Sequence, residues 1–194
     1  MKRFPERNVV FVHIPKTAGQ AVVAAFGLTH EPSDHDIAGP DQEALLAPDL
    51  IRFCVVRNPF KRFVSAYRYS VFMCSKRPEL PERQFILKHG LDKNVNTFIE
   101  KLVELDFDIL KRPHFRRQKF FVTKTRPKII LRFENLEADL QIIRRLVPDL
   151  WVGLAPVNVS DDRVSLRKIR TDLSAASKDY LKKLYEEDFT LFAY

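Results

Sequence analysis

Residues 9–20 read VVFVHIPKTAGQ, and this stretch decides the fold class that we expect for the chain. The apolar run over residues 8–14 is too short for a helix, is rich in valine and is bounded by Pro15. These features are typical of a buried parallel strand. The next segment, residues 20–28, reads QAVVAAFGL and predicts a short helix whose small residues allow close packing on a sheet.

The loop between this strand and helix predicts a phosphate site. The first turn of a helix has unpaired N–H groups, and the helix dipole adds partial positive charge there. Lys16 supplies a full cation, Thr17 a hydroxyl donor, and Gly19 lets the backbone approach a ligand. A lysine and a glycine alone would equally suit an ordinary strand–helix connection, but the whole string favours the phosphate site.

The loop differs from the nucleoside-triphosphate motif GxxxxGK(S/T). It has one glycine, its lysine precedes that glycine, and no serine or threonine follows to hold magnesium. A phosphoryl group in transfer is commonly escorted by a metal because of its high charge. A sulfuryl group carries less charge, so a lysine and backbone amides can suffice, and we expect no metal.

A second buried strand is predicted over residues 50–56, which read LIRFCVV, with a helix over residues 60–73 after Asn-Pro. Arg57 follows the carboxyl end of this strand, at the sheet edge where open α/β sheets bind ligands. An arginine there can hold a phosphate through two hydrogen bonds, and Ser65 can add a hydroxyl donor. The alternative is that Arg57 forms an ion pair and Ser65 is a small packing residue.

The rest of the chain continues the alternation of strands and helices. Short apolar runs predict strands, and apolar stripes at helical spacing predict helices. The predicted strands cover residues 120–122 and 128–133, and the predicted helices cover residues 96–107, 136–147 and 173–192. This order indicates an α/β fold with a parallel sheet, in a single domain over residues 1–194.

The composition narrows the setting. A formal charge of +8 favours an anionic partner, which nucleic acid, acidic lipid, a phosphorylated cofactor or an acidic substrate would equally provide. Two cysteines, Cys54 and Cys74, are too few for a disulfide framework. We find neither a membrane-spanning apolar stretch nor a secretion signal, so we expect a cytoplasmic protein.

Two of these motifs carry a resemblance to a known family. HIPKTAG resembles the 5′-phosphosulfate loop of sulfotransferases, in the branch that includes carbohydrate sulfotransferases, and VVRNPFKRFVSAY resembles their 3′-phosphate motif. The resemblance implies a P-loop-like three-layer domain, with a central parallel sheet flanked by helices, that binds 3′-phosphoadenosine 5′-phosphosulfate. It makes Lys16 the catalytic cation and Arg57 and Ser65 the ligands of the 3′-phosphate. The residues that it wraps around the 5′ end are Lys16, Thr17, Ala18, Gly19, Gln20 and Ala21. The chain departs from the family at Gln20-Ala21, where a hydroxyl residue is more usual.

The resemblance also suggests a general base and a closing loop. Sulfuryl transfer to a hydroxyl needs a base of near-neutral pKa, for which histidine fits best. Of five histidines, His114 matches an H-x-x-x-Q pattern of carbohydrate sulfotransferases and is our choice, although a surface histidine would look similar. His13 precedes the lysine and is interpreted as structural. Asn158 and Ser160, in the string VNVS, are placed over the cofactor by resemblance alone.

The leading hypothesis is therefore a sulfotransferase that acts on a hydroxyl of a carbohydrate, with no metal and no nucleic-acid partner. An atypical P-loop kinase and a basic nucleic-acid-binding module are the alternatives. Basic residues accumulate over residues 111–128 without one acidic residue. They suit either a wall for an acidic glycan or a solvated face. The sequence does not identify the acceptor.

Overall fold

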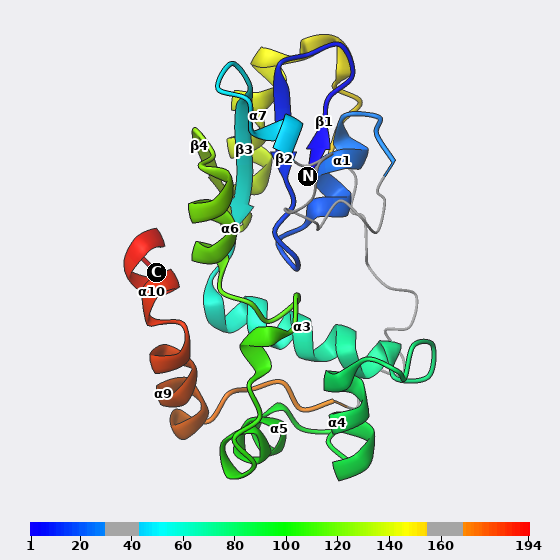
Figure 1. Cartoon of the computed structure of the whole chain (residues 1–194), viewed down its shortest axis with the longest axis vertical. Coiled ribbons are helices and arrows are strands. Elements are labelled where there is room, and N and C mark those ends of the chain that lie inside the picture. The colour runs from blue at the N-terminus through cyan, green and yellow to red at the C-terminus, as the bar shows by residue number, and fades with distance from the viewer. Residues whose placement is uncertain (30–42, 155–168) are drawn as a thin grey trace. The chain divides into compact units, whose positions relative to one another are not determined.

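The computed structural model describes residues 1–29, 43–154 and 169–194 (Figure 1). The chain forms two compact units, each made of two separate stretches. The first unit comprises Met1–Asn58 and Gln118–Asn158, and the second comprises Pro59–Arg117 and Val159–Tyr194. Each unit is described by itself below, and the single domain expected over the whole chain stays a prediction.

A four-stranded sheet forms the first unit. Its strands are β1 (Lys2–Arg3), β2 (Val9–Val12), β3 (Ile51–Val56) and β4 (Ile129–Arg132), in the order β1-β2-β3-β4. The last three are parallel, and β1 pairs antiparallel with β2. The α/β class and the three long strands expected from sequence are thereby confirmed. The edge strand β1 was not predicted, because two basic residues carry no alternation of apolar and polar positions.

One face of this sheet is covered by α1 (Gly19–Ala25) and α7 (Leu136–Leu146), the two helices expected after the first and last strands. Their buried residues Val22 and Ile143 belong to the same apolar core as Phe11, Phe53 and Leu131 of the strands. Burial of each such side chain contributes about 1.5–3 kcal/mol. The packing therefore holds the carboxyl ends of β2 and β3 in a defined place.

Helix α6 (Gln118–Thr125) packs on β3, and the strand predicted over residues 120–122 is wrong. The three residues FFV are apolar and favour a strand locally. However, the buried residues of the segment are Gln118, Phe121 and Thr125, at spacings of three and four that belong to a helix. The Thr125 hydroxyl donates to the Phe121 carbonyl at 2.8 Å, as helical geometry allows.

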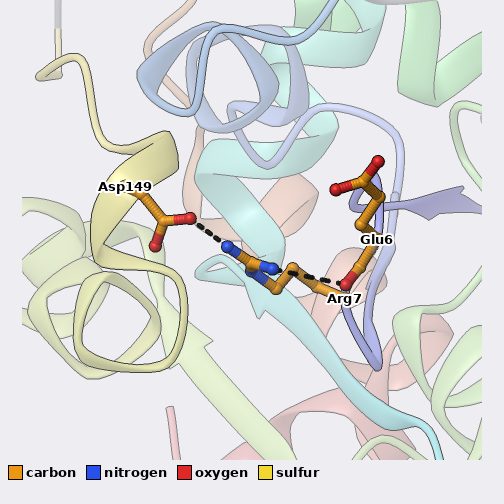
Figure 2. Close-up of polar contacts among 3 residues, drawn as sticks. All are labelled: Glu6, Arg7 and Asp149. Atoms are coloured by element: carbon orange, nitrogen blue, oxygen red, sulfur yellow. Dashed lines mark hydrogen bonds and ion pairs between the residues drawn. The ribbon is translucent and has the colours of Figure 1, made fainter.

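Short 3-10 turns complete the first unit. They are η2 (Ala44–Leu46), η4 (Phe133–Asn135) and η5 (Pro148–Leu150). Figure 2 shows Arg7, in the turn before β2, reaching the Asp149 carboxylate of η5 and the Glu6 carbonyl. Its own backbone hydrogen bond and the nearby Arg7 lower the pKa of Asp149. Both partners are exposed, so this ion pair adds little to stability.

The second unit is helical. It contains α3 (Pro59–Met73), α4 (Pro81–His89), α5 (Val95–Glu104), η3 (Ile109–Lys111), α9 (Ala175–Leu184) and α10 (Glu186–Phe192). The helices predicted over residues 60–73 and 96–107 correspond to α3 and α5. Aromatic rings fill the core, and Phe63 lies 5.2 Å from Phe115 and 6.1 Å from Phe98, centre to centre.

The single helix predicted over residues 173–192 is in fact two helices, α9 and α10. Helix α9 ends at Tyr185, whose φ and ψ are −113° and 23° and therefore not helical. Tyr185 is buried, and its hydroxyl donates to the Phe115 carbonyl at 2.6 Å. This tertiary hydrogen bond fixes the break, and no periodicity in the sequence signals it.

No helix in the three described stretches of chain is both long and apolar enough to cross a membrane.

Candidate functional site

The loop from β2 to α1 has an unusual backbone. Lys16 and Ala18 both take the left-handed conformation, with φ of 70° and 69°. Alanine and lysine rarely adopt it, and such strain gathers at binding sites. Left-handed residues beside right-handed ones turn successive amides toward a common point, which forms an anion-binding concavity. Ala18 is the N-cap of α1, and no side chain caps the helix there.

His13 explains the glycine of this loop. A Cβ added to Gly19 would lie 1.8 Å from Nε2 of His13. The His13 ring is buried and stacks on Phe11, with 5.5 Å between ring centres. Gly19 therefore makes room for a protein side chain, whereas sequence reasoning assigned its space to a ligand. His13 has the structural place expected for it.

The Thr17 hydroxyl, expected as a phosphate donor, has a protein partner in this structure. Thr17 is fully buried, and its hydroxyl donates to the Ile14 carbonyl at 2.8 Å. Because a hydroxyl has one hydrogen, this bond holds the loop and occupies the hydroxyl donor of Thr17, which leaves its backbone N–H for a phosphate. The side chain of Ala21 is also buried, while Gln20 is exposed. Backbone amides and the Lys16 ammonium are thus the groups with which the loop can bind an anion.

Arg57 meets this loop. The residue follows β3, and its Nη1 donates to the Lys16 carbonyl at 3.2 Å. Its guanidinium carbon lies 4.0 Å from the ring centre of Phe133. The expectation that the second strand ends at the same sheet edge as the first loop is therefore confirmed. The Arg57 guanidinium thus contacts the backbone of the loop that carries Lys16.

Two residues to which sequence reasoning gave no binding role hold Arg57 and its neighbour in place. The side-chain amide of Gln118 accepts from the Arg57 N–H and donates to the Arg57 carbonyl, both at 2.9 Å. Gln118 is fully buried, at the start of α6. The Glu134 carboxylate accepts from the Asn58 N–H at 2.9 Å. Asn58 is the residue that precedes α3. Gln118 is the last residue of the H-x-x-x-Q pattern that begins at His114. That pattern is the sequence signal by which its role could have been found.

Ser65 and His114 belong to the second unit. The His114 ring lies 4.8 Å from that of Tyr69, and its carbonyl accepts from Nη2 of Arg62 at 3.2 Å. Ser65 and Tyr69 are four residues apart on α3 and hence share a helix face. Both Ser65 and His114 are half-buried. Asn158 and Ser160 lie outside the described residues.

The cysteines do not suit nucleophilic chemistry. Burial raises the pKa of the Cys54 thiol to about 12. Burial also raises the pKa of Cys74, and the carboxylates of Asp92 and Glu82 add to the shift against the opposing effect of Arg83. A thiolate is the reactive form of cysteine, so both residues are inert at neutral pH. Within the described parts of the chain, no three His, Cys, Asp or Glu side chains gather as a metal site would require.

The chain matches a known protein family. A family model described as "Sulfotransferase family" covers residues 1–194, the whole chain, and is of the family 2-like type. Neither the search of curated proteins nor that of solved structures found a match.

Proposed function

Because the chain belongs to the sulfotransferase family, we propose that it moves a sulfuryl group from 3′-phosphoadenosine 5′-phosphosulfate to a hydroxyl of a carbohydrate. The observation that carries the proposal is the meeting of Arg57 with the Lys16 loop at one sheet edge. A donor with phosphates at both its 5′ and 3′ positions needs two cationic groups of this kind. A simple phosphate site would need only the loop.

The loop fits the 5′ end of this donor. Left-handed residues such as Lys16 and Ala18 favour a backbone whose amides, here those of residues 17–20, can bind one anion, and the first turn of α1 adds its dipole. The buried Ala21 supplies no hydroxyl, so the loop relies on backbone amides where the family more often has a serine or threonine. The Lys16 ammonium supplies the charge.

Lys16 acts on the leaving group. When the bond between sulfur and the bridging phosphate oxygen breaks, negative charge grows on that oxygen. The Lys16 ammonium stabilises this charge more strongly in the transition state than in the ground state, which lowers the barrier. A new bond forms between sulfur and the acceptor oxygen. The nucleotide leaves as adenosine 3′,5′-bisphosphate.

His114 receives the proton of the acceptor hydroxyl, and Arg57 and Ser65 hold the 3′-phosphate. Arg57 suits its part because its guanidinium presents several donors in one plane. Ser65 adds a hydroxyl donor, and Asn158 and Ser160 would complete the cover over the nucleotide. The basic residues from Lys111 to Lys119 favour an acidic carbohydrate as acceptor.

Calorimetry tests the nucleotide assignment. We expect adenosine 3′,5′-bisphosphate to bind much more tightly than AMP or ATP, with no requirement for magnesium. Equal affinities for the three ligands, or no binding, would overturn the proposal. Tight, magnesium-dependent binding of ATP would indicate a kinase instead.

A transfer assay tests the reaction. Incubation with donor labelled in its sulfuryl group and a panel of neutral and acidic oligosaccharides should give a labelled product. Lys16→Ala should lower the rate by about 10²–10³-fold, as removal of other groups that stabilise an oxyanion does. Lys178→Ala, an exposed change on α9, is the matched control and should leave the rate unchanged. The cytoplasmic location stays a prediction.

A further inference from the structure

The first unit contains a second basic site, at the opposite end of its strands. A pocket of about 550 Å³ is lined by Leu46, Pro48, Arg52, Thr123, Lys124, Thr125 and Arg126. Arg52 lies near the amino end of β3, whereas Arg57 follows its carboxyl end. Five residues of strand separate them by about 16 Å at the usual rise. The pocket is therefore distinct from the Lys16 loop.

Arg52 brings a buried positive charge to this pocket. Its side chain is 7% exposed, so the guanidinium is withdrawn from bulk water. Its Nε donates to the Thr125 carbonyl and its Nη1 to the Ala47 carbonyl, both at 2.7 Å. Both acceptors are neutral, and among the described residues no carboxylate accepts a hydrogen bond from Arg52. Buried arginines are normally paired with an acid, so an anion in the pocket would supply the missing charge.

The end of α6 adds two more cations, Lys124 and Arg126. Basic residues often end a helix simply to bond its last carbonyls. Here protein donors already occupy two of the last four carbonyls of the helix, those of Val122 and Thr125. The Thr125 hydroxyl bonds the Phe121 carbonyl, the Arg126 N–H bonds the Val122 carbonyl, and Arg52 bonds the Thr125 carbonyl, all within 2.8 Å. The charges of Lys124 and Arg126 are thus not needed at these two carbonyls, and both residues line the pocket.

The backbone of Arg126 supports the same conclusion. Its φ is 47°, in the left-handed region, at the position after a helix where glycine is the unstrained residue. An arginine there strains the backbone without burying its side chain, since Arg126 is exposed. A role for the guanidinium at the pocket explains why a side chain stands at this position.

The geometry points to an anion-binding site that takes a small molecule with a sulfate or phosphate ester. Three of the seven lining residues are cations and none is acidic. Thr123 is an exposed hydroxyl donor, and Leu46 and Pro48 offer an apolar wall to the rest of the ligand. This site goes beyond the proposed transfer reaction and does not depend on it.

Backbone amide shifts of the ¹⁵N-labelled full chain test the site, with glucose 6-phosphate, inorganic phosphate and glucose as probes. Both phosphate-bearing probes should move the amides of residues 123–126 with saturation, and glucose should not. Equal affinities for glucose 6-phosphate and inorganic phosphate would show that the site recognises the oxyanion alone. Tighter binding of the ester would add a contribution from the apolar wall. Either result supports the site.

A charge-matched pair of double variants makes the test specific. Lys124→Ala with Arg126→Gly removes both exposed cations and keeps the left-handed backbone relaxed, so the chain should fold. We expect the affinity at residues 123–126 to fall about tenfold or more, as loss of two charge-assisted contacts implies. Lys178→Ala with Lys182→Ala, on α9, removes the same charge and should change nothing.

Shifts that do not saturate, that glucose also causes, or that persist in the first double variant would overturn this inference. The amides of residues 16–21 report the loop separately in the same spectra. A failure of the loop to bind phosphate would therefore count against the proposed function alone.

Discussion

Nη1 of Arg57 donates to the carbonyl oxygen of Lys16 at 3.2 Å, and the Arg57 guanidinium stacks on Phe133. This contact joins the two predicted phosphate motifs through residues that lie 41 positions apart in the sequence. It uses one of the five N–H donors of the guanidinium, and the stacking fixes the plane of the group. Arg57 is thus a preorganised cation beside the loop.

Arg57→Lys should separate charge from geometry. Lysine keeps the positive charge but loses the planar fork that binds a phosphate through two hydrogen bonds. We expect the affinity for adenosine 3′,5′-bisphosphate to fall about tenfold or more, with that for AMP unchanged. Arg7→Lys is the matched control in the same unit, because Arg7 also contacts a carbonyl (Figure 2). An equal loss for both nucleotides would contradict a role at the 3′-phosphate.

Gly19→Ala should destabilise the first unit through His13. The added Cβ would lie 1.8 Å from Nε2 of His13, so the ring or the loop must move. Overpacking of this kind costs about 1–3 kcal/mol of unfolding free energy, measurable by urea denaturation. The double change with His13→Ala should recover part of the loss. A Gly19→Ala chain as stable as the natural chain would contradict the close packing of the His13 ring on Gly19.

Gln118→Ala should loosen Arg57. The change removes the side chain that bonds the half-buried N–H and carbonyl of Arg57, at a cost of about 1 kcal/mol for each hydrogen bond. We expect lower stability and weaker binding of the bisphosphate together. Gln118→Glu keeps an acceptor but loses the donor to the carbonyl, so it should also destabilise. Full binding by a folded Gln118→Ala chain would show that this amide does not position Arg57.

His114→Ala should abolish transfer and spare nucleotide binding, because a general base acts on the acceptor. His89→Ala is its matched control in the second unit. His89 packs on Phe85 with 5.0 Å between ring centres, as His114 packs on Tyr69 at 4.8 Å. Rates and bisphosphate affinities of both variants are to be compared. Turnover retained in His114→Ala would remove this residue from the role of base.

Cys54 should weaken the fold at alkaline pH. Burial raises its pKa from 9.0 to about 12, so the folded chain keeps the proton while the unfolded chain loses it above pH 9. Stability from this group is therefore complete below pH 9 and falls as the pH rises toward 12. Between pH 8 and pH 10 the free energy of unfolding should drop by about 1.4 kcal/mol more in the natural chain than in Cys54→Ala. Urea denaturation of both chains at the two pH values gives these free energies. An equal change for the natural chain and for Cys54→Ala would contradict this burial of the thiol.

Much of the first unit was predictable, because its signals are local. The runs that became β2, β3 and β4 are apolar, short and bounded by turn residues, which is the usual signal of a buried strand. β2 and β3 are buried on both faces, whereas Ile130 of the edge strand β4 is exposed. The same runs placed Lys16 and Arg57 at strand ends. Since parallel strands end at a common edge, their proximity followed from topology.

Other features depend on contacts between distant parts of the chain. FFV at residues 120–122 favours a strand by itself, yet burial of Gln118, Phe121 and Thr125 against the sheet makes it helical. The helix predicted over residues 173–192 is interrupted where Tyr185 bonds the Phe115 carbonyl. Local propensity is weak compared with such tertiary contacts, so the sequence alone could not settle either case.

The sequence by itself determined the chemical type of the first loop, because residue types and their order set which groups can meet an anion. Only the tertiary structure decided how each group is used. It turned the Thr17 hydroxyl inward to the Ile14 carbonyl, filled the space at Gly19 with the His13 ring, and bound Arg57 to the Lys16 carbonyl. The physical reason is that a side chain's donors go to the nearest unsatisfied acceptor in the fold, and their distance is not written in the order of residues.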